Sequence, residues 1–171
     1  MSPASVRAAR LGLILFLAIC VQSAFAESLR LFGVTPDIPL VVAIVGSMFY
    51  DANRGALTGF IAGVFHAALT SPSGGGFTAL ILSRLLVCFG VGWLEERVFR
   101  DSFPLALGIV ALGSLFTECL FFVIAPQPNP SHWLRQMLFT VLYNTLLTLP
   151  VYLTVRKFVA SVRDSEDSHS F

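Results

Sequence analysis

Long apolar stretches alternate with short polar breaks along the whole chain. Apolar residues dominate six segments, which are 11–26, 37–50, 55–69, 77–94, 103–125 and 133–155. A helix needs about 20 apolar residues to cross a bilayer. The pattern therefore predicts an all-α polytopic membrane protein with six transmembrane helices. Segments 37–50 and 55–69 are short for spans, so we expect them to form a tilted antiparallel pair or to lie where the bilayer is thin.

Turn-forming residues mark where these helices begin and end. Thr35-Pro36-Asp37 is typical of a helix start, residues 71–76 read Ser-Pro-Ser-Gly-Gly-Gly, and residues 126–130 read Pro-Gln-Pro-Asn-Pro. Every break is short, so residues 1–162 are expected to form a single six-helix domain. The polar residues 163–171 are expected to form a disordered cytoplasmic tail.

Composition narrows the class of protein further. Of the 171 residues, 56% are apolar and 12% are charged, whereas a soluble domain carries about 25% charged residues. Six spans leave about 50 residues for all loops and tails, so no separate catalytic domain fits outside the membrane. The net charge of +1, without a basic cluster, argues against a nucleic-acid partner.

The distribution of arginine and lysine predicts the orientation in the membrane. With the N-terminus inside, the outer side holds only Arg30 and Arg135, and most other basic residues lie on the cytoplasmic side. These cytoplasmic residues are Arg7, Arg10, Arg54, Arg97, Arg100, Arg156, Lys157 and Arg163. Six helices then place both termini in the cytoplasm.

Two charges fall inside predicted spans, where charge is costly and therefore informative. Arg84 and Glu118 each lie seven residues from the outer end of their segments, about 10 Å deep. His66 lies within one turn of the same end, so the three are expected to form an intramembrane polar cluster. One interpretation is an ion pair between Arg84 and Glu118 that holds two helices in register. The other is a site for a solute or a lipid headgroup.

A stripe of small residues follows the third segment. Gly55, Gly59, Gly63 and Ala67 recur every four residues and share one helix face. Such a face lets a second helix approach closely. It serves either helix packing within the chain or docking of a partner.

Catalytic, cofactor and metal sites are not predicted. Cys20, Cys88 and Cys119 lie in apolar segments without metal-ligand spacing, so we also expect no disulfide framework. Residues 95–100, Glu-Glu-Arg-Val-Phe-Arg, resemble the first motif of CAAX-type intramembrane proteases. That family also needs two later histidine motifs, and after Arg100 this chain has only His132 and His169. We therefore expect no enzyme activity.

Taken in order, several sequence features resemble the MreD family of rod shape-determining membrane proteins. They are Thr35-Pro36-Asp37-Ile38-Pro39-Leu40, residues 54–63, residues 75–80, residues 96–102, Glu118, and Tyr143-Asn144-Thr145 before Pro150. The likeness covers nearly the whole chain, and Pro36, Asp37, Glu118 and Asn144 are among the positions that match best. The family commonly has an acidic residue late in the third helix, where this chain has His66-Ala67.

The resemblance implies a multi-pass protein of the bacterial inner membrane that is not an enzyme. It implies binding of MreC and, through it, work with MreB, a penicillin-binding protein and a SEDS glycosyltransferase in peptidoglycan synthesis and rod shape. It also implies a fold similar to the substrate-binding subunits of energy-coupling-factor transporters. The alternative function is such a solute-binding subunit of a vitamin transporter, with Arg84, Glu118 and His66 facing an outward cavity.

The first segment also resembles a secretory signal peptide, because Arg7 and Arg10 precede an apolar core and Ala24-Phe25-Ala26 precede Glu27. An even number of helices works with this segment in place, so we predict that it is retained. Intact-mass measurement of the purified protein checks this prediction, and a mature chain starting at Glu27 would contradict it.

Overall fold

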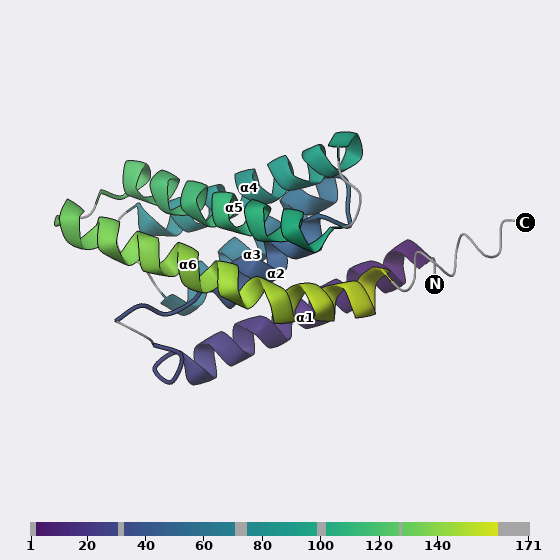
Figure 1. The fold of residues 1–171 in the computed structure, drawn as a ribbon, viewed down its shortest axis with the longest axis horizontal. Helices are drawn as coiled ribbons and strands as arrows, with labels where there is room; N and C mark the ends of the chain where they lie inside the picture. The colour runs from purple at the N-terminus through teal and green to yellow at the C-terminus, as the bar shows by residue number, and fades with distance from the viewer. Residues whose placement is uncertain (1–2, 31–32, 71–74, 99–101, 127, 161–171) are drawn as a thin grey trace, which may run out of the picture.

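The chain folds into helices that pack lengthwise into one bundle (Figure 1). This computed structural model describes residues 3–30, 33–70, 75–98, 102–126 and 128–160. The predicted tail, residues 163–171, lies outside the described residues. The helices are α1 (Pro3–Phe25), α2 (Ile38–Ser47), α3 (Ala52–Thr70), α4 (Gly76–Val98), α5 (Phe103–Ile124), α6 (Pro130–Val155) and the π-helical turn η1 (Arg156–Ala160). The all-α prediction is confirmed for the described part of the chain, which holds six α-helices at the six predicted segments.

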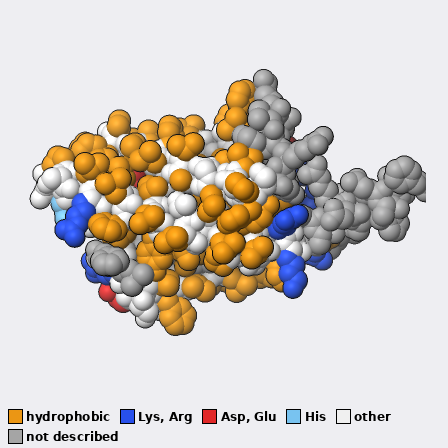
Figure 2. Space-filling model, in the orientation of Figure 1, with side chains coloured by type: hydrophobic (Ala, Val, Ile, Leu, Met, Phe, Trp, Pro, Cys, Tyr) orange, Lys and Arg blue, Asp and Glu red, His pale blue; other side chains and the backbone are white. Residues whose placement is uncertain are grey.

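Four of these helices are long and apolar enough to cross a membrane. They span Ser5–Phe25, Gly76–Leu94, Phe103–Ile124 and Pro130–Val159. Hydrophobic side chains cover most of the face shown in Figure 2, and basic side chains lie near its two ends. An apolar exterior with charge at its ends suits a bilayer rather than water. These four helices indicate a membrane protein.

The short helix α2 forms the interior of the bundle. It has only 10 residues, about 15 Å of helix, and every residue from Pro39 to Tyr50 is buried. It contacts α1, α3, α4, α5 and α6. A helix that is apolar on all sides is one that other elements surround. Segment 37–50 therefore contains an enclosed central helix, whereas the apolar pattern predicted a short span that is tilted or lies where the bilayer is thin.

The small-residue face of α3 packs against α4 within the chain. A methyl group on Gly55 would lie 2.5 Å from the Cys88 carbonyl oxygen, and one on Gly63 would lie 2.7 Å from Ile81 Cα. A methyl group on Gly59 would overlap the Arg84 carbonyl group. Ala67 is fully buried. Because the α4 backbone occupies this face, the structure leaves it no room for a partner helix.

The start of α1 and the end of the described chain lie together at one end of the bundle (Figure 1). The Arg10 side chain donates a hydrogen bond from Nη1 to the Phe158 carbonyl oxygen at 3.0 Å. Both described ends of the chain therefore lie on the same side.

We predict that Gly59→Ala destabilises the fold by about 1–3 kcal/mol, because the new methyl group meets backbone that cannot rotate away. Gly108→Ala on α5 is the matched control, since its methyl group would meet nothing within 4 Å. The control is expected to be neutral or stabilising by up to about 1 kcal/mol. Unfolding midpoints of both variants in one detergent check this, and equal midpoints would contradict the close α3–α4 approach.

Candidate functional site

The site is built around the start of α2. Asp37 caps this helix by accepting a hydrogen bond from the Leu40 N–H to its Oδ1 atom at 3.0 Å. Pro39 occupies the first turn and has no N–H to satisfy. The Val41 N–H donates to the Asp37 carbonyl oxygen. The sequence Asp-Ile-Pro-Leu thus forms a helix start that satisfies much of its own first turn.

Two side-chain amides from other helices hold the remaining backbone groups. Gln22 of α1 donates from Nε2 to the Pro36 carbonyl oxygen at 2.7 Å and accepts at Oε1 from the Ile38 N–H at 3.2 Å. Asn144 of α6 accepts at Oδ1 from the Asp37 N–H at 2.8 Å and donates from Nδ2 to Ser114 Oγ at 3.1 Å. Asn144 is fully buried, so its amide is a structural clamp rather than a lipid-facing group.

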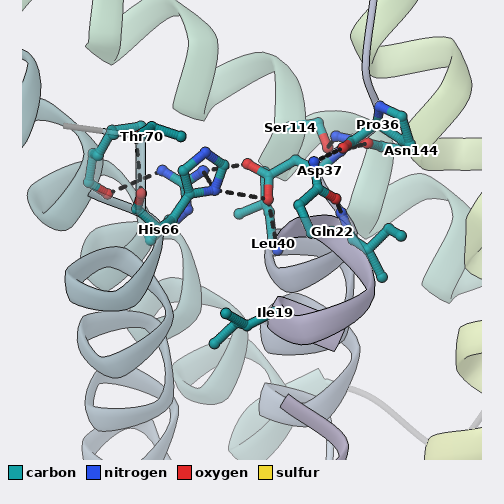
Figure 3. Close-up of polar contacts among 12 residues, drawn as sticks. Ile19, Gln22, Pro36, Asp37, Leu40, His66, Thr70, Ser114 and Asn144 are labelled. Carbon is teal, nitrogen blue, oxygen red and sulfur yellow. Dashed lines mark hydrogen bonds and ion pairs between the residues drawn. The ribbon is translucent and has the colours of Figure 1, made fainter. Parts of the chain in front are cut away.

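A charged group completes the cluster. The Asp37 carboxylate forms an ion pair through Oδ2 with Arg84 of α4, which is only 1% exposed. Arg84 also donates from Nη1 to the Leu80 carbonyl oxygen at 3.2 Å. His66 of α3 places Nδ1 3.4 Å from Asp37 Oδ1 and 3.1 Å from Arg84 Nη2. In Figure 3, Asp37 lies between His66 and Asn144, with Gln22 below it.

The position of the proton on the His66 ring decides which neighbour Nδ1 bonds. Arginine can only donate hydrogen bonds, so Nδ1 accepts from Arg84 when the ring is neutral with its proton on Nε2. When Nδ1 carries a hydrogen, it donates to Asp37 Oδ1 instead. In either state the imidazole extends the Asp37–Arg84 pair toward α3.

The structure brings Arg84 and His66 together, and places Glu118 on the wall of the same cavity. The carboxylate that pairs with Arg84 is Asp37, whereas the sequence interpretation paired Arg84 with Glu118. Among the described residues the Glu118 side chain has no hydrogen-bond or ion-pair partner. Arg84 and Glu118 both line the same cavity, but Asp37 reaches Arg84 from the start of α2. Matched depth on two helices was therefore an insufficient guide to the pairing.

The cluster forms the wall of an open cavity of about 500 Å³. Gln22, Asp37, His66, Arg84 and Glu118 contribute its polar surface, and Ile19, Leu69, Leu80 and Phe121 contribute apolar surface. A volume of this size suits a small ligand. The arrangement provides binding chemistry, because α1, the start of α2, α3, α4 and α5 each contribute one of these polar side chains.

The described residues provide no second candidate for chemistry. They contain no group of three His, Cys, Asp or Glu side chains that could hold a metal ion. Cys20, Cys88 and Cys119 are free thiols, and only Cys88 is buried. The side chains of Glu95 and Glu96, the glutamates of the protease-like motif, lie outside the described residues.

Comparison of the chain with protein-family models, curated proteins and solved structures gives no match. The resemblance to the MreD family therefore depends on the ordered sequence features alone.

We predict that Asp37→Asn destabilises the protein by about 3–5 kcal/mol, because it leaves the buried Arg84 charge unpaired. Asparagine keeps an oxygen for the helix cap, so the loss reports the charge. Combining it with Arg84→Met is expected to cost much less than the sum of the two single changes. Glu118→Gln is the matched control and should cost less than about 1 kcal/mol. Unfolding free energies from one denaturant titration check these values.

Additive effects at Asp37 and Arg84, together with strong coupling between Arg84 and Glu118, would contradict the pairing described above. That result would restore the pair inferred from helix depth.

Proposed function

We propose that this protein is a non-enzymatic scaffold of the bacterial inner membrane that belongs to the cell-elongation machinery. In this proposal it binds MreC and helps to control peptidoglycan synthesis and rod shape. All six helices cross or enter the membrane, the fold is similar to that of energy-coupling-factor substrate-binding subunits, and both termini are cytoplasmic. MreB, a penicillin-binding protein and a SEDS glycosyltransferase would be reached indirectly.

One observation supports this proposal above the others. Pro36, Asp37 and Asn144 carry the resemblance to MreD, and Asp37 and Asn144 lie 107 residues apart in the sequence. All three belong to one hydrogen-bonded network around the start of α2, and Glu118 lies on the adjoining cavity. Chance similarity between apolar helices has no reason to select polar positions that meet in space. A shared structural purpose for these positions is what a family resemblance requires.

The packing of the chain suggests where a partner helix would dock. The glycine face of α3 is occupied by α4, so docking requires another surface. An apolar groove of about 600 Å³ runs between α1 and α6, and Ile38 and Val42 of the central helix form part of it. A single transmembrane helix of MreC in this groove would contact α2, which the other helices otherwise enclose. Van der Waals packing of this kind drives helix association in lipid.

The 500 Å³ cavity favours a second candidate function, the solute-binding subunit of a vitamin transporter. In that case the protein would associate with a coupling protein and its ATPases instead of MreC. Genes for cell-shape proteins beside its own gene would favour the scaffold, and genes for an ATPase and a coupling protein would favour transport.

We predict that the full-length protein, co-expressed with MreC from the same genome, retains MreC through purification in mild detergent. A photo-cross-linking residue at Leu17, which lies in the α1–α6 groove, should capture MreC. The same residue at Leu112 on α5 is the control, because Leu112 is 69% exposed and lies outside that groove. Immunoblotting of the cross-linked products checks both positions.

Capture from Leu112 but not from Leu17 would place the partner elsewhere. Failure to retain MreC at all, with the coupling protein retained instead, would replace the scaffold with the transport function.

A further inference from the structure

A second groove runs between α1 and α3, on the face of α1 opposite the α1–α6 groove. Its volume is about 280 Å³, less than half that of the α1–α6 groove. Large apolar side chains that are exposed form much of its wall, namely Phe16 of α1 and Leu57, Ile61 and Phe65 of α3. The groove is therefore a separate apolar surface that the protein itself leaves uncovered.

The length of this groove matches one leaflet of a bilayer. It extends from Ala8 to Ile19 on α1 and from Arg54 to Phe65 on α3. Each stretch rises about 16 Å at 1.5 Å per residue, and half of the hydrocarbon core is about 15 Å deep. Gly12 lies along the groove, and a methyl group there would meet nothing within 4 Å. The groove thus has the depth and the open space for a lipid chain of one leaflet.

Arg54 and Tyr50 form the polar end of the groove. The Arg54 side chain is 52% exposed, and its Nε atom lies 3.7 Å from Asp51 Oδ1, which is longer than a hydrogen bond. Such an exposed ion pair is weak. Arg7 and Arg54 both lie close enough to Tyr50 for their charges to act on its hydroxyl. Two positive charges therefore lie at this end, against the single negative charge of Asp51.

The Tyr50 hydroxyl lacks a hydrogen-bond partner in the protein. Tyr50 is only 6% exposed, and its hydroxyl oxygen is buried without a partner among the described residues. Buried polar groups almost always have one. The arginine side chains near it can only donate, so neither Arg7 nor Arg54 can accept its hydrogen. This hydroxyl indicates a hydrogen-bond acceptor that comes from outside the protein.

A phospholipid with a negatively charged headgroup fits both ends of the groove. Its phosphate oxygens accept hydrogen bonds from arginine and from a hydroxyl, and its acyl chain covers the apolar walls. A zwitterionic headgroup would bring an ammonium group among positive charges. A transmembrane helix is about 10 Å across, and its backbone acceptors are bonded internally, so it fits this narrower groove and the Tyr50 hydroxyl less well.

We propose that the α1–α3 groove binds one anionic phospholipid. Its phosphate lies between Arg54 and Arg7, and the Tyr50 hydroxyl donates to a phosphate oxygen as the exposed Arg54 side chain turns toward the lipid. One acyl chain runs past Gly12 toward Phe65. Basic pockets between transmembrane helices hold anionic headgroups in this way. This inference goes beyond the scaffold function and does not depend on it.

Native mass spectrometry of the delipidated full-length protein in mild detergent tests the proposal. The protein is titrated with phosphatidylglycerol or with phosphatidylcholine that has the same acyl chains. We expect one molecule of phosphatidylglycerol to bind at least about fivefold more tightly than phosphatidylcholine. Equal affinity for the two lipids overturns the proposal.

Arg54→Gln should weaken phosphatidylglycerol binding by about fivefold, because one positive charge beside the phosphate is lost. Arg54→Lys keeps the charge and should retain most of the affinity. Arg30→Gln is the matched control, because the Arg30 side chain is also 52% exposed, lies 3.8 Å from an acidic residue three positions away, and is outside the groove. Equal losses in Arg54→Gln and Arg30→Gln overturn the proposal.

Tyr50→Phe should weaken phosphatidylglycerol binding by about tenfold, because a hydrogen bond to a charged group is lost. This variant changes no charge, so general attraction of the lipid to a basic surface predicts no effect. Unchanged binding by Tyr50→Phe overturns the proposal.

Gly12→Leu tests the path of the acyl chain without altering the charged end. The leucine side chain enters open space, so the fold should tolerate it, and phosphatidylglycerol binding should fall. Gly108→Leu on α5 is its control, because Gly108 also faces open space and lies outside the groove. Equal binding by the two variants overturns the proposal. Helicity and monodispersity of every variant identify misfolded preparations.

Discussion

The need to satisfy backbone N–H groups inside a membrane protein governs this structure. A helix of only 10 residues begins inside the bundle, and the protein itself bonds the N–H groups of its first turn. The Asp37 carboxylate bonds the Leu40 N–H, Gln22 bonds that of Ile38, and Asn144 bonds that of Asp37. Proline at position 39 removes the remaining donor. The polar residues of the bundle interior are therefore consequences of placing a short helix at its centre.

The charged residues follow from the same requirement. An ionised aspartate makes a strong helix cap, but a buried carboxylate needs a counter-ion. Arg84 supplies it from α4, and His66 from α3 lies beside both groups. Because each partner comes from a different helix, the pairings tie α1, α3, α4 and α6 to one point on α2. Apolar packing alone tolerates sliding of helices in lipid, so these directional bonds are what define their relative register.

The sequence predicted the helices better than it predicted their neighbours. Apolar segments and turn residues located all six, but lipid is as apolar as a protein interior, so hydropathy did not distinguish α2 from a lipid-facing span. The useful clue was length, because segment 37–50 is too short to cross a bilayer comfortably. Depth counting placed Arg84, His66 and Glu118 near one another. It assigned Asp37 only to a helix start, because depth counting places every residue at a break outside the membrane and takes no account of the helices that enclose it.

Two proposed binding surfaces depend on the same helix start. Asp37 contributes to the polar cavity, and the next residue, Ile38, contributes to the apolar groove between α1 and α6. Gln22 lines the cavity while bonding the Ile38 N–H, so its amide connects the two surfaces directly. A partner helix seated against Ile38 and a ligand held in the cavity would both contact residues that this one clamp positions. Rigid support of this kind keeps both surfaces in place at once. The proposed scaffold function requires this support, because the central helix that carries both surfaces is short.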